Sequence, residues 1–66
     1  MSRETMVQIS VRNASMVELG TRLSEWCDFE IFVPARAFEN KVTKKLTKVP
    51  LESAIKELGM LIADRQ

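Results

Sequence analysis

The chain has 66 residues, of which 45% are hydrophobic and 29% charged, and a formal net charge of +1 at pH 7. A domain of this length has a stability margin on the order of 3–10 kcal/mol, which argues against a self-contained enzyme with a strained active site. The sequence has no histidine, and Cys27 is its only cysteine, so it lacks the commonest general base, any internal disulfide and nearly every zinc ligand set. We therefore expect a protein that is not an enzyme and holds no metal or cofactor.

The first strand and the first helix are indicated by the spacing of apolar residues and by a helix-capping pattern between them. Apolar and polar residues alternate over Val7–Val11, which predicts a strand with one buried face. Ser15 and Glu18 have the spacing of a capping box, so a helix is expected to begin there. Gly20 in this helix costs about 1 kcal/mol relative to alanine, and we interpret it as tolerated rather than as a sign of close packing. The expected buried stripe of the helix is Met16, Leu19, Leu23 and Trp26.

A second strand is predicted over residues 29–33, where apolar residues alternate before Pro34 ends the run. Phe32 points to the face opposite Phe29 and Ile31, so it is either covered by a loop or exposed as a contact for a partner. A loop over residues 34–40, with room for a helical turn, follows this strand.

Residues 41–49 are rich in threonine and valine with interleaved lysines, which is typical of a strand exposed at a sheet edge. A second helix is then expected from Pro50 to near Gly59. Its buried face is Leu51, Ala54, Ile55 and Leu58. Residues 60–63 fit either a last strand or a continuation of the helix, and we favour the strand.

The resulting order of strand, helix, strand, strand, helix and strand predicts an α+β fold in two layers, with both helices packed on one face of a small sheet. We expect one domain over residues 1–66, with its ordered core at 6–63 and frayed ends at 1–5 and 64–66.

The densest charge cluster consists of lysines on the predicted third strand, and it has two interpretations. Four lysines on an extended segment could bind phosphates, which gives a small nucleic-acid-binding protein as the alternative function. They could instead protect an edge strand from aggregation. We favour protection, because the segment 41–48 lacks stacking aromatics and the balanced net charge gives no reason to expect nucleic acid. The cluster is Lys41, Lys44, Lys45 and Lys48.

No set of residues in the sequence has the pattern of a catalytic or metal site. Cys27 follows the carboxyl end of a predicted helix, where the helix dipole disfavours a thiolate, so we interpret it as a half-buried packing residue. Glu25, Asp28 and Glu30 lack the glycine-bearing loop of a calcium site, and we interpret them as solvated surface charges. Trp26 and the four methionines are expected to fill the core, although Met60 or Met6 at a frayed end could contribute to a hydrophobic contact.

Several segments together resemble a known family of bacterial envelope domains. They are the opening strand and turn, the first helix, the second strand, and a third strand that leads into the motif Val49-Pro50-Leu51-Glu52-Ser53-Ala54-Ile55. This motif looks like the V-P-L-E-x-A-L helix of the amino-terminal domains of secretins and of the STN (secretin and TonB amino-terminal) module of signalling outer-membrane receptors. Lys44 stands where that family usually has an apolar residue.

The resemblance implies a non-enzymatic assembly or docking module that acts in secretion, transport or envelope signalling. Its partners would be proteins, including copies of itself, bound through sheet edges or lateral packing. We take Phe32, Lys41, Lys44, Lys45 and Lys48 as the candidate interaction surface. No stretch reaches the roughly eighteen apolar residues that a membrane-spanning helix needs. We expect a periplasmic location if this is a domain of a longer precursor, and a cytoplasmic one if the chain is complete.

Overall fold

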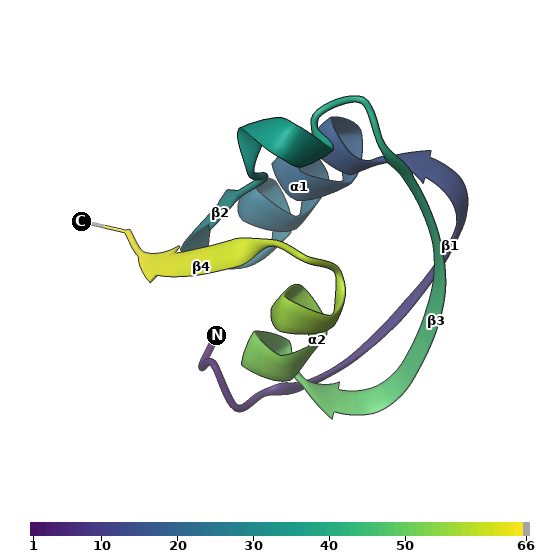
Figure 1. Cartoon of the computed structure of the whole chain (residues 1–66). Coiled ribbons are helices and arrows are strands. Elements are labelled where there is room, and N and C mark those ends of the chain that lie inside the picture. The colour runs from purple at the N-terminus through teal and green to yellow at the C-terminus, as the bar shows by residue number, and fades with distance from the viewer. Residues whose placement is uncertain (66) are drawn as a thin grey trace.

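The computed structural model describes residues 1–65 and contains two helices and four strands (Figure 1). The α+β class and the expected element order are confirmed, including the helical turn after the second strand and the strand near the carboxyl end. The elements are β1 (Met6–Ser15), α1 (Met16–Trp26), β2 (Phe29–Phe32), the 3₁₀ turn η1 (Ala35–Ala37), β3 (Lys41–Pro50), α2 (Leu51–Glu57) and β4 (Leu61–Asp64).

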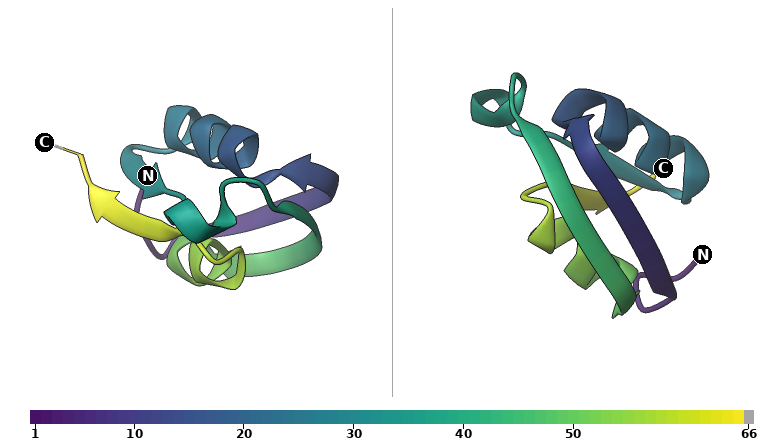
Figure 2. Two further views of the ribbon diagram at one scale, coloured as in Figure 1. Left: turned by 45° about the horizontal axis from the view of Figure 1, so that its top comes forward. Right: turned by 90° about the vertical axis from the view of Figure 1, so that its right-hand side faces the viewer.

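The strands form two separate antiparallel sheets, β1 with β3 and β2 with β4, instead of the one sheet expected from the sequence. Both helices lie between these sheets, and each helix contacts strands of both (Figures 1 and 2). The two strands that frame α1 are kept apart by that helix, because α1 contacts both β1 and β2 while the two strands do not pair with each other.

The β1–β3 ribbon is curved by two irregularities in its register, one between Val7 and Ile9 and one between Val11 and Ala14. A residue with left-handed backbone stands at each of them, Asn13 in β1 and Lys48 in β3, both with φ of 52°. Bulges of this kind bend a strand and increase its twist. The ribbon therefore curves around the helices, as Figure 1 shows.

α2 forms the centre of the core, because it contacts β1, β3 and β4. Its predicted apolar face is confirmed: Leu51, Ala54 and Ile55 have no exposed surface and Leu58 is buried. Gly59 adopts φ of 78°, a conformation that favours glycine and ends the helix as expected. The backbone N–H of Met60 then donates to the Ile55 carbonyl at 3.0 Å and directs the chain into β4.

α1 begins and packs largely as the sequence predicts. The Ser15 hydroxyl accepts a hydrogen bond from the Glu18 N–H at 3.4 Å, which caps the helix. Leu19 and Leu23 are buried, but Trp26 is 53% exposed, so its assignment to the core is wrong. Cys27, one position later, is 1% exposed and belongs to the core.

Gly20 lies where the backbone of α1 packs tightly on the end of β2, and the interpretation of simple tolerance is wrong. A Cβ atom on Gly20 would lie 2.7 Å from Cγ2 of Val33, the residue after β2. Real Cβ contacts essentially never come so close. The helix backbone therefore packs directly on the valine side chain, and the absence of a side chain at position 20 allows this contact.

The segment 1–5 lies against α2. The N–H groups of Leu51 and Glu52 donate to the carbonyls of Thr5 and Arg3 at 2.9 and 3.0 Å. The Arg3 guanidinium donates to Glu52 at 3.0 Å and to Asp64 at 3.2 Å, and its hydrogen bond with Glu52 is the largest cause that raises the pKa of Arg3. Gln66 lies outside the described residues, and the fraying expected at 1–5 and 64–66 stays a prediction.

Candidate protein-interaction surface

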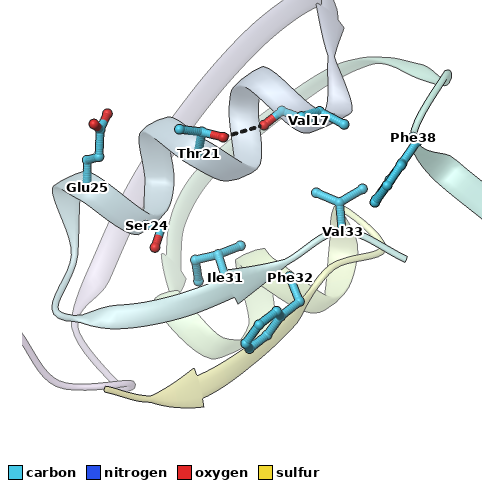
Figure 3. A pocket seen from close by; sticks show the side chains of 8 residues that line it. All are labelled: Val17, Thr21, Ser24, Glu25, Ile31, Phe32, Val33 and Phe38. Atoms are coloured by element: carbon cyan, nitrogen blue, oxygen red, sulfur yellow. Dashed lines mark hydrogen bonds between the residues drawn. The ribbon is translucent and has the colours of Figure 1, made fainter. Parts of the chain in front are cut away.

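A groove of about 380 Å³ runs between α1, β2 and the loop that contains η1. Figure 3 shows Ile31 and Val33 pointing from β2 and its end toward α1, with Phe38 at one end of the groove. Val17 and Phe38 are 42% and 54% exposed, so part of the groove wall is apolar and open to solvent. The lining residues are Val17, Thr21, Ser24, Glu25, Ile31, Phe32, Val33 and Phe38.

Phe32 lies on the outer face of the β2–β4 sheet. Side chains alternate along a strand, so Ile31 is buried and Phe32 faces the other way, as the sequence predicts. Of the two alternatives for Phe32, covered by a loop or exposed, the structure shows exposure, at 50%. The register places Leu61, which is 61% exposed, directly opposite Phe32. Sequence reasoning missed this partner, because nothing in the sequence shows that β4 pairs with β2. The two side chains form a cross-strand apolar pair on a solvent-exposed face.

Each of the four strands pairs on one side only among the described residues, so each leaves one sheet edge open. Two-stranded sheets are marginally stable in water and are strengthened by further strands. Part of the β2 edge is covered: the Phe29 carbonyl accepts hydrogen bonds from the Ser24 hydroxyl at 3.3 Å and from the Arg65 guanidinium at 3.2 Å. Glu30 holds Arg65 in this position through an ion pair of 3.3 Å.

The four predicted lysines do not lie together with Phe32, because they belong to the other sheet. They do not share one face of β3 either. Lys41 and Lys45 are exposed, whereas Lys44 is half-buried on the same face as Val42 and Leu46. The Lys44 ammonium lies 3.6 Å from a carboxylate oxygen of Glu57. β3 is an edge strand, as predicted, and its lysines do not form a single phosphate-binding row.

The residues weighed for catalysis or metal binding are placed as follows. The Cys27 thiol is buried, more deeply than expected, and lies 3.9 Å from the Phe29 carbonyl oxygen, which is consistent with packing. Asp28 forms an ion pair with the amino terminus at 3.2 Å. Within residues 1–65, no group of three or more acidic or cysteine side chains is arranged to hold a metal ion.

A second groove, of about 260 Å³, lies between α1 and β1. It is lined by residues 8–11 of the strand and by Arg22, Leu23 and Trp26 of the helix. Sequence reasoning missed this groove because it placed Trp26 in the core. That Trp26 lies exposed beside the open edge of β1 can be recognised only when the pairing of the strands is known.

Comparison with known proteins adds no relative: no family model matches the chain, and neither a curated protein nor a solved structure does. The resemblance to secretin and STN domains therefore stays a prediction. Among the described residues, neither helix has the length and apolar character needed to cross a bilayer.

Proposed function

We propose that this chain is a non-enzymatic protein-interaction module of the secretin or STN type, which joins an envelope assembly through its β2–β4 sheet. The observation that carries the proposal is the exposed pair of Phe32 and Leu61 beside the open edge of β4. The element order and the motif that begins at Val49 support the envelope context. The periplasm is the proposed location.

A partner strand would pair with β4 and extend the sheet. Its backbone would hydrogen-bond to the open edge, and its side chains on the outer face would cover Leu61 and Phe32. Removing the remaining exposed surface of these two side chains from water contributes about 2–3 kcal/mol in total. Association costs an estimated 4–15 kcal/mol in lost freedom of motion. One such contact is therefore weak, and the module is suited to an assembly in which several contacts act together.

The proposal can be tested by photo-crosslinking in bacterial cells. A photoreactive phenylalanine analogue is placed at position 32, and at position 56 as a matched control, because Lys56 is exposed and belongs to α2 rather than to β2 or β4. Each variant is produced with and without an export signal. We expect adducts of defined mass from position 32 only, and only in the exported form.

Leu61→Asp places a charge at the centre of the proposed contact while leaving the buried core unchanged, because Leu61 is exposed. This substitution should abolish the adducts formed from position 32. Equal labelling at positions 32 and 56, or adducts that survive Leu61→Asp, would contradict the proposed surface. Adducts that form only in the cytoplasm would contradict the proposed location.

A further inference from the structure

The groove between α1 and β1 combines an open strand edge with a helix wall. Figure 2 shows α1 beside β1 on the side away from β3. Four consecutive β1 residues, 8–11, line the groove, and within residues 1–65 no strand pairs with this edge of β1. A run of consecutive strand residues presents backbone donors and acceptors at regular spacing, which is what an added strand requires.

The helix wall supplies two side chains one turn apart. Arg22 and Trp26 are exposed and four positions apart, so they lie on the same side of α1, while Leu23 is buried at the base of the groove. Arg22 is the one charged residue that lines the groove. No carboxylate of the described residues forms an ion pair with it. Within residues 1–65 the groove thus contains a cation without an ion-pair partner, and the Trp26 ring lines the same groove.

The sheet that borders the groove is strongly basic. β1 and β3 together contain Arg12 and four lysines and no acidic residue. A surface of one charge sign attracts ligands of the opposite sign and orients them during encounter. The charge and the open edge therefore point to an extended ligand that is itself acidic.

We propose that the groove between α1 and β1 binds an extended acidic peptide segment, which adds to the open edge of β1 as a strand. A carboxylate of the segment pairs with Arg22, and an apolar side chain lies against Trp26. This inference goes beyond the proposed function, because it uses the other sheet and assigns the chemistry of a partner.

The spacing of the two anchors defines the peptide. Four helical residues span about 6 Å along the helix axis. Side chains on one face of a strand, two positions apart, are separated by about 6.8 Å. The acidic and the apolar residue of the ligand are therefore expected two positions apart, with one residue between them that faces away from the groove.

The test uses NMR of the isotope-labelled full chain titrated with short blocked peptides. The probe carries a Glu-Thr-Leu or Leu-Thr-Glu centre flanked by threonine and valine, because the direction of the added strand is not fixed by the anchors. A matched peptide replaces glutamate with lysine. A third peptide carries N-methyl groups on alternate backbone amides, which prevents strand addition. We expect signal shifts at residues 8–11 and at the Trp26 indole with the acidic peptide only.

Three variants separate the parts of the proposal. Arg22→Glu should reverse the preference, with about tenfold weaker binding of the acidic peptide and gained binding of the lysine peptide. Trp26→Ala should weaken binding of the acidic peptide by about tenfold or more. Arg36→Glu makes the same charge change on η1, where Arg36 lines neither groove, and should leave the affinity unchanged. All three residues are exposed, so folding is expected to be preserved.

Several results would overturn the inference. They are equal binding of the acidic and lysine peptides, unchanged binding after N-methylation, shifts centred on β4, and no shifts at all. A single-stranded oligonucleotide that binds residues 8–11 and Trp26 more tightly than the acidic peptide would assign the groove to nucleic acid instead. None of these outcomes depends on crosslinking at position 32, so this inference and the proposed function can fail separately.

Discussion

The contact between Gly20 and Val33 makes an unusual prediction about a helical glycine. Replacing glycine with alanine inside a helix normally stabilises a protein by about 1 kcal/mol. Here the new Cβ would lie 2.7 Å from Val33 Cγ2, whereas the next contact, to the Met60 sulfur at 3.8 Å, is ordinary. Valine is stiff about its first side-chain bond, so relief requires a new rotamer or separation of α1 from β2, at a cost of about 1–3 kcal/mol. Gly20→Ala should therefore lower the free energy of unfolding by up to about 2 kcal/mol.

A double-mutant cycle measures this contact directly. In a Val33→Ala background the clashing methyl group is gone, and Gly20→Ala should raise the free energy of unfolding by about 1 kcal/mol. Urea denaturation of the four proteins gives the coupling energy, which we expect to be about 1–3 kcal/mol. If Gly20→Ala stabilises both backgrounds equally, with a coupling energy below about 0.5 kcal/mol, the close packing of α1 on Val33 is refuted.

Three further predictions concern the core, the lysine strand and the amino-terminal segment. Ile55→Ala removes a side chain with no exposed surface and should lower the free energy of unfolding, measured by urea denaturation, by about 2–5 kcal/mol, a large part of the expected stability. A loss below about 1 kcal/mol would contradict the central position of α2. Lys44→Leu should raise the free energy of unfolding by about 0.5–1 kcal/mol, because Lys44 shares the inward, apolar face of β3 with Val42 and because its ion pair with Glu57 is largely exposed. The control Lys45→Leu changes the outward face of the strand and should give no such gain. Arg3→Gln should accelerate hydrogen exchange of the Leu51 and Glu52 N–H groups, which bond to residues 1–5, and leave exchange at Met60 unchanged.

Local patterns predicted the elements well, because each depends on neighbouring residues. The serine cap of α1 and the buried face of α2 follow from spacing within one turn or two. The left-handed Gly59 needs no tertiary information to be expected at a helix end. These features are decided within a few residues of the chain, and the structure confirms them.

The arrangement of the elements could not be predicted in the same way, because it depends on which strands pair. β1 pairs with β3 and β2 pairs with β4, but the alternation of side chains along β1 would be the same in one sheet or in two. Trp26 is exposed and its neighbour Cys27 is buried. At a helix end the apolar period alone does not decide which of two adjacent residues enters the core. The close contact at Gly20 involves Val33, which is thirteen positions away, so the sequence of the helix alone could not predict it.

The candidate surface was predicted in part. The outward direction of Phe32 follows from strand alternation, whereas its pairing with Leu61 depends on the register of β2 and β4. Placing the lysines and Phe32 in one interaction surface assumes that all strands belong to one sheet. Because β3 belongs to the other sheet, and because Lys44 points inward to Glu57, that grouping does not survive in the structure.

The four open sheet edges differ in how they are protected, and this difference connects the fold to the two proposed surfaces. β3 carries exposed lysines, which oppose the addition of another strand. The Phe29 carbonyl of β2 is already hydrogen-bonded by Ser24 and Arg65. β1 and β4 contain no lysine, and each borders an exposed apolar side chain, Trp26 for β1 and Leu61 for β4. If strand addition is the mode of binding, it is therefore expected at β1 and β4, which belong to different sheets, so that two partners can be bound without competing for one edge.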